Sequence, residues 1–147
     1  MANPTNPSLL TPVDTAIVVG NVLVFTFTAP SDTDNQKLVF RLELDTNNPI
    51  DSEGVNYKAF ESRLSSNAKI HGTWEVDNGS GTFIAIPTGG MASTYYGNTA
   101  RVKIRKQDVS SYPDIKTVWY WRIGASDAMI HPPVFNQVIF AQCRFGE

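Results

Sequence analysis

The sequence has a single cysteine, no long apolar run and almost no imbalance of charge. Cys143 has no second cysteine to pair with, so an intramolecular disulfide is excluded and packing alone must stabilise the fold. The 12 basic and 14 acidic side chains give a formal net charge of −2, too balanced for electrostatic capture of nucleic acid or anionic lipid. No apolar stretch is long enough to cross a bilayer, so neither nucleic-acid binding nor membrane insertion is expected.

The sequence also lacks the motifs of catalytic sites. His71 and His131 lie far apart, neither has an Asp or Cys at ligand spacing, and no phosphate-binding loop, zinc-protease helix or nucleophile elbow is present. Cys143 follows an apolar stretch, where a small buried residue is expected rather than a reactive thiol. We therefore expect a protein that is not an enzyme and requires no cofactor.

The first dozen residues contain neither the basic cluster nor the apolar segment of a signal peptide, so we expect no export by that route. Pro4, Pro7 and Pro12 favour extended backbone. Residues 1–12 are therefore predicted to form an extended N-terminal arm or edge strand, with residues 8–11 adding to a sheet. We expect the first residues of this arm to anchor the domain to a larger assembly.

What the sequence has in abundance is strict alternation of apolar and polar residues. The run from Thr117 to Asp127 places Trp119, Trp121 and Ile123 on one face, which is typical of a central strand with one buried side. Trp121 is predicted to lie in the core. Arg122 is predicted to lie on the surface. Similar patterns predict strands over residues 21–28, 38–44, 69–76, 82–86, 99–105 and, less regularly, 135–145.

Between residues 45 and 66 the alternation is lost, and residues 57–64 fit either a short helical turn or an irregular edge. The glycines of segment 77–81 suit a hairpin between the strands on either side. Without helical periodicity or strand–helix alternation, the chain is predicted to be all-β, a single sandwich over residues 13–147 with an extra hairpin insertion at about 45–97.

Leu9 to Pro12, the loop 31–35, the run 39–45 and above all Trp119 to Asp127 resemble a fibronectin type III module of the bacterial or bacteriophage kind. Such a module is an immunoglobulin-like β-sandwich. These motifs are core and turn signatures, so the resemblance implies a fold more directly than an activity.

The resemblance implies a non-catalytic structural or assembly protein of a bacteriophage virion, such as a capsid decoration, head-fibre or tail-associated protein. It would be made in the host cytoplasm and act through protein–protein contacts with other virion or assembly proteins, as a homo-oligomer or part of a larger lattice. The alternative is a β-sandwich module that binds carbohydrate or a receptor, with a cell-surface glycan as its partner.

Four aromatic residues are the candidate binding residues for this alternative, because flat rings with polar rims can stack on sugars: Trp74, Tyr95, Tyr96 and Tyr120. Ordinary packing or contacts between subunits are the commoner role of such residues.

One loop is rich in oxygen-bearing side chains. Asp32, Asp34 and Asn35 lie close together in sequence, and Asp127 at the end of a neighbouring strand is a further candidate calcium ligand. Calcium requires six to eight oxygens, whereas Asp and Asn in turns commonly bond to local backbone. We therefore expect turn chemistry and no bound metal at these weak candidates.

Overall fold

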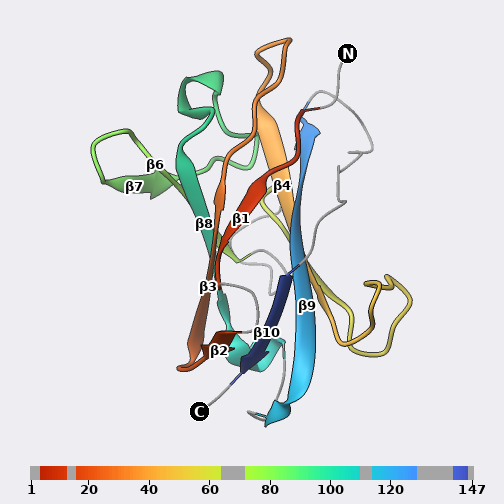
Figure 1. Ribbon diagram of the computed structural model, residues 1–147. Helices are drawn as coiled ribbons and strands as arrows, with labels where there is room; N and C mark the ends of the chain where they lie inside the picture. The colour runs from red at the N-terminus through yellow and green to blue at the C-terminus, as the bar shows by residue number, and fades with distance from the viewer. Residues whose placement is uncertain (1–3, 13–15, 64–71, 110–113, 129–140, 146–147) are drawn as a thin grey trace.

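The computed structural model describes residues 4–12, 16–63, 72–109, 114–128 and 141–145, and the account below concerns these ranges. Within them the protein is all-β, with ten strands in two five-stranded sheets that pack as a β-sandwich (Figure 1). The helical content of these ranges is two single 3₁₀ turns, η1 (Ser93–Tyr95) and η2 (Lys106–Asp108).

The first sheet is antiparallel throughout, and its strands lie in the order β1 (Ser8–Thr11), β3 (Val22–Thr28), β8 (Thr99–Arg105), β6 (Thr73–Asp77) and β7 (Phe83–Ala85). The second sheet has the order β2 (Ala16–Val18), β10 (Ala141–Phe145), β9 (Asp114–Asp127), β4 (Leu38–Asp45) and β5 (Lys58–Glu61). β2 runs parallel to β10, and the other pairs are antiparallel.

The strongest alternating patterns form strands as predicted. β3, β4 and β8 match the predicted segments to within one residue, and β6 and β7 form the predicted hairpin. β9 begins three residues before the predicted run. The segment 45–97, expected as an insertion, contributes β5 to one sheet and β6 and β7 to the other, while β2 was not predicted. Most of the predicted last strand lies outside the described residues, which include only β10.

Aromatic side chains from both sheets meet in the core. Phe25 on β3 contacts Trp121 on β9 edge to face, with ring centroids 5.0 Å apart. Phe40 on β4 stacks on Trp74 on β6 at 6.1 Å, and Phe27 contacts both rings. Such pairs add to the free energy gained by burying large apolar surfaces. Trp121 is fully buried, so its predicted core position is confirmed.

The N-terminal segment is held by the domain itself. Pro4 and Pro7 are buried, the Thr5 amide donates to the Ser31 carbonyl at 2.9 Å, and the Ser31 amide donates to Thr5 Oγ1 at 3.1 Å. β1 then pairs with β3 as the edge strand of the first sheet. The described part of this segment is therefore bound within the fold, and its role as an anchor to a larger assembly stays a prediction.

Candidate functional site

A polar hollow of about 660 Å³ opens on the outer face of the second sheet. Its strand residues are Arg41 and Glu43 on β4 and Arg122 on β9, and the remainder of its lining is Tyr57 and the loop 47–52 that follows β4. Alternation along β4 places Arg41 and Glu43 on this outer face, opposite the core residues Leu42 and Leu44.

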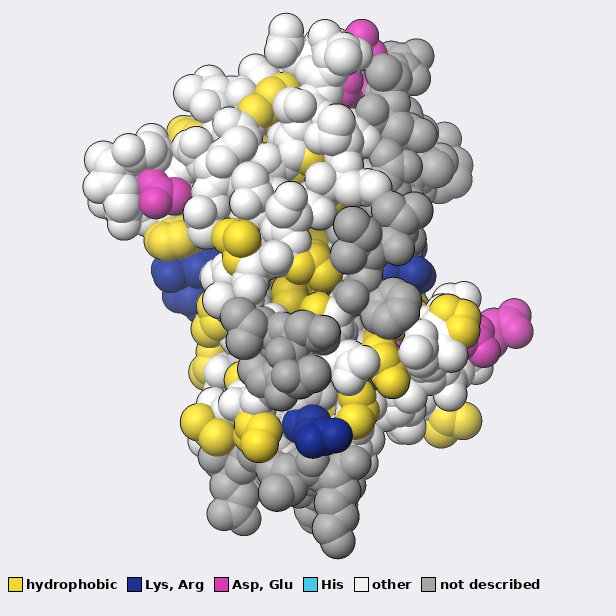
Figure 2. All heavy atoms as spheres, in the orientation of Figure 1, with side chains coloured by type: hydrophobic (Ala, Val, Ile, Leu, Met, Phe, Trp, Pro, Cys, Tyr) yellow, Lys and Arg dark blue, Asp and Glu magenta, His cyan; other side chains and the backbone are white. Residues whose placement is uncertain are grey.

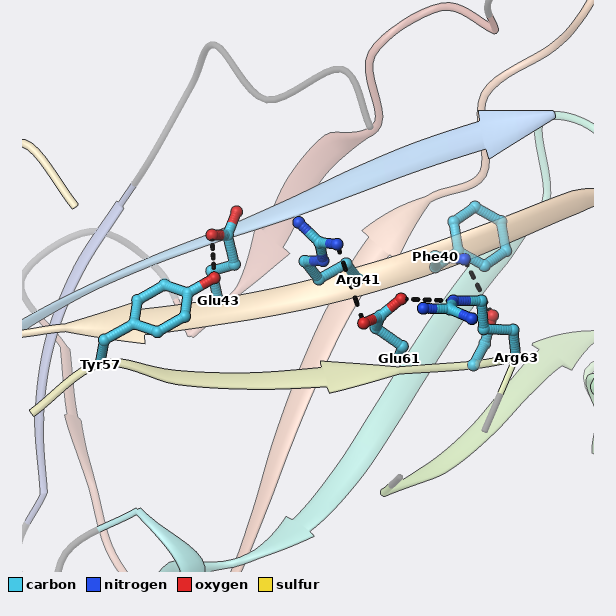
Figure 3. A network of polar contacts seen from close by, with 7 residues as sticks. Phe40, Arg41, Glu43, Tyr57, Glu61 and Arg63 are labelled. Atoms are coloured by element: carbon cyan, nitrogen blue, oxygen red, sulfur yellow. Dashed lines mark hydrogen bonds and ion pairs between the residues drawn. The ribbon is translucent and has the colours of Figure 1, made fainter. Parts of the chain in front are cut away.

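Glu43 is the centre of the polar network in this hollow. It lies directly opposite Arg122 in the β4–β9 register, and Arg122 Nε donates to Glu43 Oε1 at 3.0 Å. The Tyr57 hydroxyl donates to Glu43 Oε2, as Figure 3 shows. Only 2% of Glu43 is exposed, so a buried carboxylate is compensated here by one cation and one hydroxyl.

The neighbouring charges are also paired. Arg41 Nη2 lies 3.7 Å from Glu61 Oε2 on β5, and Glu61 Oε1 lies 2.7 Å from Arg63 Nε (Figure 3). Burial first, then the hydrogen bond to Glu43 and its charge, raise the pKa of Tyr57 well above the usual range. Tyr57 therefore remains a neutral donor at physiological pH, and the hollow offers hydrogen-bonding groups with little net charge.

Asp45 fixes the loop that forms the rim of the hollow. This residue is fully buried at the end of β4, where Oδ1 accepts the Thr46 amide and Oδ2 accepts the Asp51 amide, each at 2.8 Å. A Cβ on Gly54 would lie 2.7 Å from Asn47 Nδ2 and 3.0 Å from Asp45 Oδ2, so the rim packs tightly there. Sequence reasoning missed this site, although two charged residues on one face of a central strand were its visible signal.

Burial excludes one of the four aromatic candidates from a stacking platform. Trp74 is only 2% exposed and packs in the core, so it cannot offer a ring face to a sugar, and its expected binding role is corrected to packing. Tyr120 is half-buried, and Tyr95 and Tyr96 pack partly buried against the core. The Tyr96 hydroxyl donates to the Gln36 carbonyl, which holds that ring in place.

Three of the four oxygen-rich candidates come together. One carboxylate oxygen each from Asp32, Asp34 and Asp127 lies within 4.8 Å of the others, and we call this group the carboxylate cluster. Asp32 and Asp127 are buried, whereas Asp34 is exposed. Asn35 is not part of the cluster, and its amide donates to the Asp32 carbonyl at 3.0 Å from a left-handed backbone conformation with φ of 54°.

The pKa of Tyr96 is affected by the charge of the carboxylate cluster. Burial, followed by the negative charges of Asp32, Asp127 and Asp34, raises the pKa of Tyr96 to about 12. All three carboxylates thus disfavour ionisation of the Tyr96 phenol, which comes from a different loop.

A third feature is apolar. Ile17, Val19 and Val22 have exposed fractions of 55%, 64% and 55%, and we call them the apolar end. They flank a turn at Gly20, where φ is +99°. Figure 2 shows hydrophobic side chains gathered at the lower left, over β2 and the lower end of β3.

The remaining candidates are the cysteine and the two histidines. Cys143 is fully buried, as predicted, and burial raises the pKa of its thiol to about 12, so the reactive thiolate is disfavoured. His71 and His131 lie outside the described residues. In the described part of the chain, no helix has the length and apolar character that a membrane span requires.

Comparison with family models, curated proteins and solved structures gives no match for this chain.

Proposed function

We propose that this protein is a non-catalytic structural component of a bacteriophage virion, a capsid decoration, head-fibre or tail-associated protein that acts through protein–protein contacts. The observation that carries the proposal is the apolar end, where three aliphatic side chains within six residues are more than half exposed. Contiguous exposed apolar surface is typical of sites that another protein covers. The attribution to a virion rests on the resemblance to phage fibronectin type III modules.

An immunoglobulin-like topology is part of this proposal, and the strand orders support it. In immunoglobulin domains one sheet has the order A-B-E-D and the other C-F-G. The order β1-β3-β8-β6 fits the first of these, and β4-β9-β10 fits the second. On this assignment β2 and β5 extend the second sheet at its two edges, and β7 extends the first sheet beyond β6.

The test is a triple variant, Ile17→Ser, Val19→Ser and Val22→Ser, compared with Val55→Ser. Val55 is 95% exposed but lies outside the apolar end, so it serves as a matched control. We expect the triple variant to melt like the wild type but to lose self-association, measured by light scattering, and incorporation into particles, measured by co-sedimentation. Normal incorporation of the triple variant would place the contact elsewhere. Absence of the wild-type protein from purified particles would overturn the virion assignment.

A second candidate function is carbohydrate or receptor binding, which the polar hollow favours. Its rim carries Asn47, Asn48 and Ser52, whose amide and hydroxyl groups can donate to and accept from sugar hydroxyls. A glycan array with the isolated domain tests this function. We expect any signal to fall at least tenfold in Asn47→Ala/Asn48→Ala and to persist in Gln107→Ala, an exposed amide distant in sequence. No glycan signal from the wild type would exclude this candidate.

A further inference from the structure

We propose that Asp32, Asp34 and Asp127 bind a divalent cation of the hard, oxygen-preferring class, with Ca²⁺ as the first candidate. This site is independent of the proposed contacts at the apolar end. Asp32 and Asp34 come from the loop between β3 and β4, and Asp127 is the last residue of β9. That loop and the end of β9 lie at the same end of the sandwich, the upper end in Figure 1.

The spacing of the oxygens fits one ion. Calcium–oxygen distances are about 2.3–2.6 Å, so two oxygens bound to the same Ca²⁺ lie at most about 5 Å apart. The ligand oxygens of Asp32, Asp34 and Asp127 all lie within 4.8 Å of one another. A single cation can therefore contact all three carboxylates without a large movement of the backbone.

Turn chemistry accounts for only part of Asp32. Its Oδ1 accepts the Asp34 amide at 3.0 Å, which is the local bond expected of an aspartate in a turn. Its Oδ2 is buried and has no hydrogen-bond partner within the described part of the chain, although the residue is only 4% exposed. A buried carboxylate oxygen without a partner is costly, and a bound cation would offset that cost.

The position of Asp127 is fixed by the fold before any ion binds. Asp127 pairs with Leu38 in the β4–β9 ladder, and the Ala128 amide donates to the Lys37 carbonyl at 2.9 Å. Asp127 also continues the inward parity of Trp121 and Ile123, so it enters the end of the sandwich and is fully buried. Such preorganisation lowers the entropy lost on binding.

The surroundings favour an oxygen-coordinated ion that is open to solvent. Tyr96 adjoins the cluster as a neutral phenol, and Lys37 is the nearest basic residue along the loop. Asp34 is exposed, so an ion can enter from solvent and keep water ligands. Calcium tolerates such mixed coordination, whereas Mg²⁺ requires near-ideal octahedral geometry and zinc favours His and Cys ligands.

The test is thermal melting and calorimetric titration of the full chain with CaCl2 after treatment with EDTA. We expect saturable Ca²⁺ binding and a rise of several degrees in melting temperature, because a ligand bound only by the folded state stabilises it. Asp32→Asn and Asp34→Asn should weaken Ca²⁺ affinity at least tenfold. Glu53→Gln, which changes an exposed acidic residue outside the cluster, should bind Ca²⁺ like the wild type.

If Asp32→Asn fails to fold because Asp32 is buried, Asp34→Asn still tests the proposal, because Asp34 is exposed. A wild-type protein that shows neither heat nor a shift in melting temperature at millimolar Ca²⁺ would overturn the proposal. The same conclusion would follow if Asp34→Asn and Asp32→Asn both retained wild-type affinity. A response to Mg²⁺ but not to Ca²⁺ would overturn the choice of calcium.

Discussion

Buried carboxylates at two places in this molecule are satisfied in different ways. At the polar hollow, Glu43 receives Arg122 and Tyr57, and Asp45 accepts a backbone amide at each of its oxygens. At the carboxylate cluster, Asp32 accepts one amide and keeps a second oxygen buried without a hydrogen bond in the described structure. The comparison separates carboxylates whose oxygens are all bonded by the protein itself from Asp32, to which we assign a bound cation.

The largest effect is expected from Arg122→Ala. Removing Arg122 leaves the buried Glu43 carboxylate with the Tyr57 hydroxyl but without its ion-pair partner, so we expect a loss of about 3 kcal/mol in the free energy of unfolding, measured with urea. Alternation predicted the correct face of β9 for Arg122. It did not predict the ion pair with Glu43, in which the Arg122 side chain is only 19% exposed. Arg144→Ala, at an exposed residue of β10, should cost less than about 0.5 kcal/mol. Equal losses in the two variants would show that the ion pair of Arg122 with Glu43 does not stabilise the fold.

A smaller loss is expected from Asp45→Ala. This change leaves the amides of Thr46 and Asp51 without their acceptor, and we expect the free energy of unfolding to fall by about 2 kcal/mol. Asp45→Asn keeps one acceptor oxygen and should lose less. Urea unfolding of both variants measures the difference, and identical losses would show that one remaining acceptor oxygen does not help at this position.

At alkaline pH, the free energy of unfolding should fall because of Tyr57 at the polar hollow and Tyr96 beside the carboxylate cluster. The folded-state pKa values of Tyr57 and Tyr96 are raised above the unfolded value. Their contribution to stability is therefore complete below about pH 10 and is lost as pH rises above it, because the unfolded chain ionises first. We expect at most about 1.4 kcal/mol per tyrosine at pH 11. Unfolding at pH 8 and 11 should show a smaller loss in Tyr57→Phe and Tyr96→Phe than in the wild type.

The smallest effect is expected from Asp32→Asn in EDTA. The asparagine oxygen can still accept the Asp34 amide, and repulsion from Asp34 and Asp127 decreases, so stability without metal should stay within about 0.5 kcal/mol of wild type. Thermal melting in EDTA is the measurement. A loss as large as that of Asp45→Ala would place Asp32 among the carboxylates that complete the fold.

Local patterns in the sequence predicted much of the sheet structure. β3, β4, β8 and the buried face of β9 follow from period-two alternation, which each strand carries within itself. β2 has only three residues, and it exists because β10 lies beside it. Trp74 could have been assigned to the core, since it and Val76 alternate with Thr73, Glu75 and Asp77.

The sites depend more strongly on tertiary structure. The sequence suggested that Asp127 could join Asp32 and Asp34, because strand ends and adjacent loops meet at one end of a sandwich. It could not show that Asp32 Oδ2 is buried, which depends on how separate loops pack. The polar hollow was not predicted, because the pairing of Glu43 with Arg122 depends on the register between β4 and β9.

The parallel pairing of β2 with β10 also affects how the chain is made. Ala16 pairs with Cys143, so β2 is synthesised well before the strand that it joins. Until then, β2, which includes the exposed Ile17, lacks the neighbour with which it pairs in the second sheet. Contacts between residues so distant in sequence form slowly, and unpaired edges promote aggregation. Nascent chains that stall before β10 should therefore be targets for chaperones.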